Sequence, residues 1–218
     1  MWSRDLLRVV HAGEICFLLL LLALVPARDA GAGPPTDQLR DGVDRVVRIL
    51  RDPELRGDAQ TSQRRTAVSK IAGEIFDFDD MARRALGQHW EPRTPTERVE
   101  FVRLFTEVIQ RAYMAKVDQY AAATSMVFRG ETVDGDYAVV QTTIPLSNGR
   151  VMPLDYRMRL ARDRWQVYDL TIDGISLVAN YRAQFNQVIR STSYAVLVTK
   201  LKAQQAVMGK DPRWTNVQ

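Results

Sequence analysis

In the first half of the chain, apolar residues recur at three- and four-residue spacing, the pattern of amphipathic helices. A capping box at Thr94 and Glu97, with Pro95 at the first helical position, predicts that the fourth helix begins there and runs to about Tyr120. The apolar positions of the four predicted helices are Leu39, Val43, Val46 or Val47 and Leu50; Val68, Ile71 and Ile75; Met81, Ala82, Ala85 and Leu86; and Phe101, Leu104, Phe105, Val108, Ile109, Ala112 and Tyr113.

After Ala123 the period changes from 3.6 to 2, which is typical of strands with one covered face. Turn signals at 134–135, 148–149 and 162–163 divide this stretch into four strands joined by hairpins. The third strand shows its two faces most plainly. Leu154, Tyr156, Met158 and Leu160 point one way, and Asp155, Arg157 and Arg159 point the other.

The helical period returns after Gly174 in two further stretches, separated by a break at 191–193. The order of helices, strands and helices predicts an α+β fold in which helices pack on a curved four-stranded antiparallel sheet. Such a layer of helices over a curved sheet can enclose an apolar pocket. The apolar positions of the last two helices are Val178, Tyr181, Phe185, Val188 and Ile189, and then Leu197, Val198 and Leu201.

The N-terminus has the three parts of a secretory signal peptide. Arg4 and Arg8 form a basic region, residues 15–25 are an unbroken apolar run, and small residues at 30–32 offer a cleavage site. A membrane anchor is the alternative, but the run is shorter than the roughly 20 residues that span a bilayer. We therefore predict a cleaved leader at 1–32, a single domain at 33–209 and a polar tail at 210–218.

Export decides which partners the positive charge can attract and whether the mature chain keeps its single cysteine. The chain has a net charge of +4 and a pI of about 9.4, and the leader contains three charges of each sign, so its removal leaves the net charge unchanged. Nucleic acid is excluded as a partner outside the cytoplasm, which leaves anionic lipid or an acidic protein surface. Cys16 lies inside the leader, so the mature chain is expected to have no thiol or disulfide.

Few residues offer chemistry. His89 is the only histidine after the leader, which excludes a multi-histidine metal site. Asp77, Asp79 and Asp80 lack the ligand spacing of a calcium loop, and the start of a helix already explains acidic residues there. We therefore expect no metal and no cofactor.

Two adjacent pairs, Tyr156 with Asp155 and Tyr168 with Asp169, suggest a proton-transfer enzyme on a cupped sheet. Adjacent strand residues face opposite sides, so neither pair is expected to share one cavity wall. An enzyme is therefore the weaker alternative, and a purely structural adaptor is a third.

Parity and helical spacing turn nine apolar residues toward one space between the fourth helix, the covered face of the sheet and the helix after Gly174. Core packing alone would produce the same stripes, so the pattern leaves open whether this space is filled or hollow. The predicted pocket wall is Phe105, Ile109, Tyr113, Val139, Tyr156, Met158, Val167, Tyr181 and Phe185.

Three segments carry a resemblance to a known family. They are FDFDDMARRALGQHW at 76–90, ERVEFVRLFTEVIQRAY at 97–113 and PLDYRMRLARDRWQVYDLTIDGISLVANYRAQF at 153–185. In order and spacing, over roughly residues 70–203, they resemble the toluene-tolerance family of periplasmic lipid-binding proteins, the MlaC-type auxiliary proteins of ABC transporters. The helices at 37–75 are similar to the family in pattern only.

The resemblance implies an NTF2-like cupped sheet and a pocket that buries the acyl chains of a phospholipid with the head group outside. It implies that the protein shuttles lipid between an inner-membrane ABC transporter with an MCE-domain protein and an outer-membrane lipoprotein and porin complex, in support of outer-membrane lipid asymmetry. A related branch of the family accompanies hopanoid synthesis, so a hopanoid cargo is the alternative. A carrier of this kind needs no catalytic residue.

Overall fold

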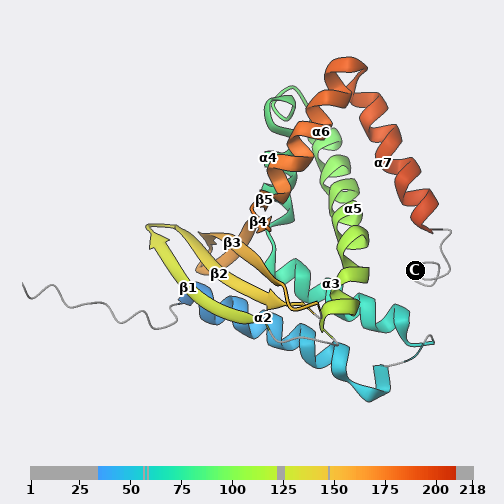
Figure 1. Cartoon of the computed structure of the whole chain (residues 1–218). Helices are drawn as coiled ribbons and strands as arrows, with labels where there is room; N and C mark the ends of the chain where they lie inside the picture. The colour runs from blue at the N-terminus through green and yellow to red at the C-terminus, as the bar shows by residue number, and fades with distance from the viewer. Residues whose placement is uncertain (1–33, 56, 58, 122–125, 147, 210–218) are drawn as a thin grey trace, which may run out of the picture. The chain divides into compact units, whose positions relative to one another are not determined.

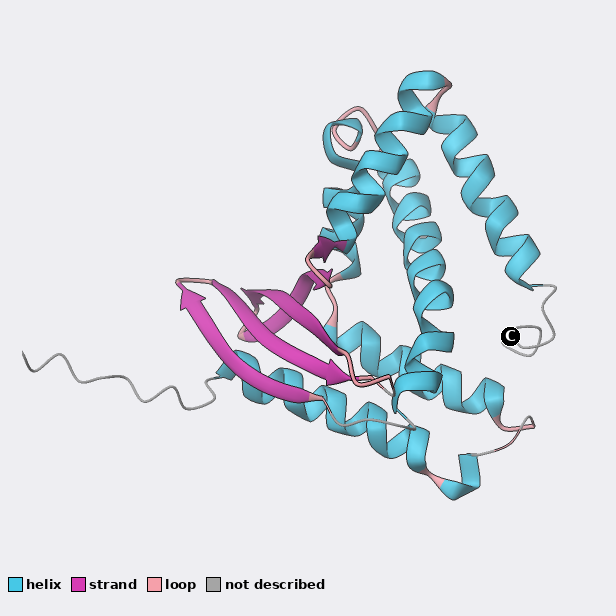
Figure 2. Cartoon of the chain, in the orientation of Figure 1, coloured by secondary structure: helices cyan, strands magenta, loops and turns pink. Residues whose placement is uncertain are grey.

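The structure is a computed structural model that describes residues 34–55, 57, 59–121, 126–146 and 148–209, without the side chains of 34, 114–121 and 205–209. The expected leader at 1–32 and tail at 210–218 lie outside these residues and stay predictions. The described elements run in the order helices, strands, helices (Figures 1 and 2). This order confirms the predicted α+β class.

Four α-helices precede the sheet and two follow it within the described ranges, and none of them is long and apolar enough to cross a membrane. The first four are α2 (Pro34–Arg51), α3 (Thr61–Ile75), α4 (Phe78–Leu86) and α5 (Pro95–Ala121). The last two are α6 (Leu177–Ser191) and α7 (Tyr194–Gly209), and short 3-10 turns lie at Pro53–Leu55 and Gly87–His89.

Side-chain caps explain where these helices begin. At α5 the predicted capping box is present: the Glu97 amide donates to Thr94 Oγ1 at 3.2 Å, and the Thr94 amide donates to Glu97 Oε2 at 2.8 Å. At α4 the Asp77 side chain accepts from the Asp80 amide at 2.9 Å. Gly87 ends α4 with a φ of 58°, a left-handed conformation that favours glycine.

The strands form one antiparallel sheet in the order β1-β2-β3-β4-β5. The predicted four strands are β1 (Val127–Asp134), β2 (Tyr137–Pro145), β3 (Val151–Ala161) and β4 (Arg164–Ile172). The sequence did not predict β5 (Ile175–Ser176), whose two residues pair with the end of β4. A strand of two residues is too short to show a period of two, which explains the omission.

The sheet has an inner face, which contains Leu154, Tyr156 and Met158, and an outer face, which contains Asp155 and Arg157. Helix α2 lies along the inner face beneath the curved strands (Figure 1). Two hydrogen bonds fix its N-terminal end there: Thr36 Oγ1 donates to Glu131 Oε2 at 2.6 Å, and the Trp165 amide donates to Gln38 Oε1 at 2.9 Å.

Two apolar clusters hold these layers together. The sheet cluster joins the inner face to α2 through Leu39, Val140 and Tyr156. The helical cluster joins α4, α5, α6 and α7, and Phe101 and Phe105 are fully buried at its centre. Partly buried Phe76 packs against both clusters and therefore connects them.

Candidate functional site

A cavity of about 310 Å³ lies between the inner face of the sheet, helices α2 and α3, and residues of α4 and α5. We call it the apolar cavity, because among the described residues that line it the only side-chain polar groups are the Gln110 amide and the hydroxyls of Tyr113 and Tyr156. It is lined by Leu39, Val43, Val46, Val47, Val68, Ala72, Ile75, Phe76, Phe78, Met81, Ile109, Gln110, Tyr113, Met126, Ile144, Met152, Leu154, Tyr156, Leu170, Ile172 and Leu177.

Helices α2 and α3 form one wall of this cavity. Helical spacing places Val43, Val46 and Val47 on the side of α2 that faces the cavity. It likewise places Val68, Ala72 and Ile75 on the side of α3 that faces the cavity. The two helices approach closely at Gly42, where an added Cβ would lie 2.6 Å from the Ile75 side chain. An ion pair of 2.6 Å between Arg45 and Glu74 joins them beside this contact.

The sheet supplies the opposite wall through the inward residues of β3 and β4. Tyr156 lies directly across from Leu170, and Leu154 lies across from Ile172. A β-bulge shifts the register between Arg157 and Met158, so that Met158 pairs with Val167 and Tyr168 is the extra residue. The bulge therefore keeps both Val167 and Leu170 on the inner face, although they are three residues apart.

Three of the nine predicted wall residues line the apolar cavity: Ile109, Tyr113 and Tyr156. Phe105, Tyr181 and Phe185 instead pack against one another, with ring centroids 5.5 to 6.2 Å apart. These edge-to-face and tilted contacts fill the helical cluster with aromatic rings. The predicted stripes on α5 and α6 thus divide into a short cavity-lining part and a packed core.

The remaining three predicted residues lie in the sheet. Met158 and Val167 face inward but are buried in the sheet cluster outside the lining of the cavity. The placement of Val139 was wrong, because Val139 pairs with Arg157 on the outer face. Its neighbour Val140 faces inward opposite Tyr156 and is fully buried. A shift of one residue moves a strand side chain to the other face, and apolar residues at 138–140 obscured the alternation.

Sequence reasoning missed the contribution of α2 and α3, although both helices and their apolar stripes were predicted. The signal for this wall was the wide apolar side of α2, formed by Val43, Val46 and Val47. A helix that packs against a single neighbour needs a narrower apolar side. On β2 the signal that Val140 faces inward was Ile144. It lies four residues further along the strand and therefore on the same face of the sheet.

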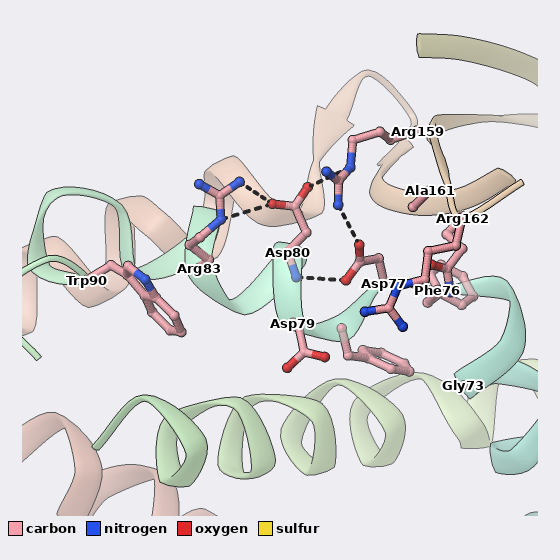
Figure 3. Close-up of a pocket in the computed structure, with 12 residues that line it drawn as sticks. Gly73, Phe76, Asp77, Asp79, Asp80, Arg83, Trp90, Arg159, Ala161 and Arg162 are labelled. Atoms are coloured by element: carbon pink, nitrogen blue, oxygen red, sulfur yellow. Dashed lines mark hydrogen bonds and ion pairs between the residues drawn. The ribbon is translucent and has the colours of Figure 1, made fainter. Parts of the chain in front are cut away.

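A second, polar cavity of about 800 Å³ lies between α4 and the turn that joins β3 to β4 (Figure 3). Its centre is the Asp80 carboxylate, which is 4% exposed and accepts hydrogen bonds from Arg83 and Arg84. Arg159 reaches across from β3, donating to Asp77 at 3.0 Å and approaching Asp80 to 3.8 Å. Phe76 and Phe78 line this polar cavity and the apolar cavity alike.

This network has a structural explanation. Burial opposes ionisation of Asp80, but hydrogen bonds from Arg84 and Arg83 outweigh it and hold the pKa of the carboxyl below its ordinary value. The cluster of Asp77, Asp79 and Asp80 thus serves the start of α4 and its contact with β3. In the part of the chain that the structure describes, no three His, Cys, Asp or Glu side chains are grouped to hold a metal ion.

One expectation about the strands needs correction. The bulge at Tyr168 breaks the parity that separated Tyr168 from Asp169. Asp169 pairs with outward Arg157, and the Tyr168 ring packs edge-to-face on outward Tyr137 with ring centroids 6.0 Å apart. Asp169 is already engaged, accepting hydrogen bonds from Ser176 Oγ at 2.6 Å and from the Val178 amide at 3.0 Å. Both partners belong to the start of α6, so this carboxylate positions a helix.

Comparison with protein families gives a match to the model of the MlaC protein over residues 40–203. The chain belongs to the MlaC family. The matched range contains every residue that lines the apolar cavity except Leu39. The cavity is therefore built almost entirely from the part of the chain that the MlaC family shares.

Two relatives agree with this membership. The toluene tolerance protein Ttg2D of Pseudomonas putida is 22% identical over 169 residues, which cover 77% of this chain and 79% of the relative. A phospholipid-binding protein from Ralstonia solanacearum, solved at 1.53 Å in complex with a phospholipid, superposes with a TM-score of 0.70 at 26% identity. That match covers 82% of this chain and all of the solved chain, and it confirms the fold of helices on an open antiparallel sheet.

Proposed function

We propose that this protein carries a phospholipid, with the acyl chains of the lipid held in the apolar cavity. The observation that carries the proposal is the cavity itself, a hollow of about 310 Å³ whose described lining residues are almost all hydrocarbon. A packed core of this size would contain few voids larger than a water molecule. The phospholipid bound by the similar Ralstonia solanacearum protein supports the choice of ligand.

The volume sets how the lipid is held. Ligand pockets span roughly 300 to 1,000 Å³, and this cavity lies at the lower end of that range. It therefore encloses chain segments and leaves the head group outside. Moving acyl chains into water costs about 0.8 kcal/mol per methylene, so two chains of a membrane lipid cannot cross an aqueous space unprotected. An apolar cavity removes most of that cost at both ends of the journey.

The expected leader at 1–32 and the MlaC membership support a site of action in the periplasm. The mature protein works in the periplasm, taking lipid from or giving lipid to an inner-membrane ABC transporter with an MCE-domain protein. An outer-membrane lipoprotein and porin complex is the other partner, and this transfer of lipid maintains lipid asymmetry in the outer membrane. The carrier catalyses no reaction, because exchange between equally apolar sites needs no bond to be broken.

Extraction of the purified protein tests this proposal. The full chain is expressed with its leader, purified from the periplasm without detergent, extracted with organic solvent and analysed by mass spectrometry. We expect glycerophospholipid in near-stoichiometric amount and an N-terminus close to Gly33. Recovery of a hopanoid would show that the cargo is a hopanoid and not a phospholipid. Recovery of almost no lipid would contradict the proposed carrier function and favour an adaptor or an enzyme.

A further inference from the structure

The Tyr156 hydroxyl lies at the wall of the apolar cavity and has no strong hydrogen-bond acceptor among the described residues. The residue is 7% exposed, and its one hydrogen bond among the described residues runs to Met126 Sδ at 4.0 Å. Both residues line the cavity. A thioether sulfur is a weak acceptor, whereas a buried phenol usually has a strong partner, and the described residues offer Tyr156 no other one.

Packing does not explain this hydroxyl. The residues opposite Tyr156 on the neighbouring strands are Val140 and Leu170, which are purely hydrocarbon. A phenylalanine ring would fill the same space without burying a polar group, and burying such a group without a good partner destabilises a protein. The hydroxyl is therefore a feature of the wall that the folded protein alone does not require.

The hydroxyl also keeps its proton and can therefore donate a hydrogen bond. Burial raises the pKa of the Tyr156 phenol well above its ordinary value, so the group stays protonated. An occupant that supplies an acceptor and is otherwise mainly hydrocarbon would satisfy this donor inside the cavity. Every acyl chain of a glycerophospholipid ends in an ester carbonyl, an acceptor with no donor of its own.

We propose that the Tyr156 hydroxyl donates a hydrogen bond to an ester carbonyl oxygen of the bound lipid. This inference rests on the proposed function and narrows the cargo: the cavity recognises the acyl ester as well as the chain. Lipids that lack the carbonyl, such as ether-linked phospholipids and polycyclic hydrocarbons, leave the hydroxyl without a better partner. Tyr156 is thus a residue that determines specificity for ester lipids.

The test compares two lipids and two proteins. Delipidated full-length mature protein, wild type and Tyr156→Phe, is titrated with diester and diether phosphatidylcholine that have the same chains and head group. We expect the wild type to bind the diester lipid about threefold to tenfold more tightly, the effect of one hydrogen bond. In Tyr156→Phe the two affinities should become equal, through weaker binding of the diester lipid alone.

A matched control is Tyr168→Phe, which removes a hydroxyl from a tyrosine whose ring lies against Tyr137 on the outer face. It should keep the wild-type preference. An ester preference that is the same in wild type and Tyr156→Phe would overturn this inference while leaving the carrier intact, whereas wild-type protein that binds neither lipid would overturn the carrier as well.

Stability supplies a second readout. Lipid-free Tyr156→Phe should unfold at a temperature equal to or above that of the wild type, because the substitution removes a buried hydroxyl with only a weak partner. A clearly lower unfolding temperature would mean that the hydroxyl serves the folded protein itself, and the assignment to the cargo would be wrong.

Discussion

Phe76 and Phe78 stack with ring centroids 5.7 Å apart, and the pair forms a common wall between the apolar cavity and the polar cavity. One side of this wall faces hydrocarbon, and the other faces the charged groups of Asp77, Asp80 and Arg159. The two rings therefore separate the apolar cavity from the polar one.

Removing one ring of this wall should increase the rate at which the protein releases its lipid. Phe78→Ala should speed transfer of a fluorescent phospholipid to acceptor vesicles by several-fold and cost about 2 kcal/mol of unfolding free energy, because the ring is half-buried. Phe78→Leu keeps an apolar barrier and should release lipid at nearly the wild-type rate. Equal release rates for the two variants would show that the wall does not retain the lipid.

The Asp80 carboxylate is expected to be a major determinant of stability. Asp80→Asn leaves Arg83, Arg84 and Arg159 without their shared anion in a partly buried site, and should cost about 3 kcal/mol in chemical denaturation. Asp79→Asn is the matched control, since Asp79 is exposed and contributes mainly to the helix dipole. It should cost less than about 1 kcal/mol.

The same carboxylate predicts a pH dependence. The pKa of Asp80 in the folded protein lies below its ordinary value of 3.8, so its stabilisation is complete above about pH 5 and is lost as the pH falls through the folded pKa. The stability difference between wild type and Asp80→Asn should be constant from pH 7 to about pH 5 and shrink at lower pH. A difference that grows on acidification would contradict this assignment.

The outer face of the sheet is expected to meet anionic membranes or acidic partners through Arg157. Arg157 is exposed and forms no ion pair with the described residues. Arg157→Glu should weaken binding to anionic vesicles about tenfold or more at low salt, less at high salt, and leave the lipid content unchanged. Arg157→Lys keeps the charge and should bind as the wild type does.

Arg159 is predicted to point to the same side of the strand as Arg157, but its guanidinium is tied to Asp77 and Asp80. Arg159→Glu would place a third negative charge beside two carboxylates, so it should lower the unfolding free energy rather than act on vesicle binding alone. Wild-type stability of this variant would show that these ion pairs contribute nothing.

Local signals made the elements predictable. The capping box at Thr94 and Glu97 fixed the start of α5, and turn residues separated the four main strands. The bulge at Tyr168 has no comparable signal, because an extra residue in a strand changes the parity without changing the composition.

The site was less predictable than the fold. Periodicity tells which side of a helix is covered, but it does not tell whether the covered space is filled. The aromatic residues Phe105, Tyr181 and Phe185 could fill their space by packing ring against ring, and they form core. The valines and the alanine on α2 and α3 have side chains too short to fill the space between these helices and the sheet, and the apolar cavity lies beside them.

A matched pair of added rings tests whether the apolar cavity holds the acyl chains. Ala72→Phe adds a ring inside the cavity, and Val139→Phe adds one on the outer face of the sheet. The measurement is moles of phospholipid per mole of purified protein, by extraction and mass spectrometry, with the unfolding temperature of the delipidated forms recorded alongside. Bound lipid should fall sharply for Ala72→Phe and stay at the wild-type level for Val139→Phe. Undiminished lipid in stably folded Ala72→Phe would contradict the placement of the acyl chains in this cavity.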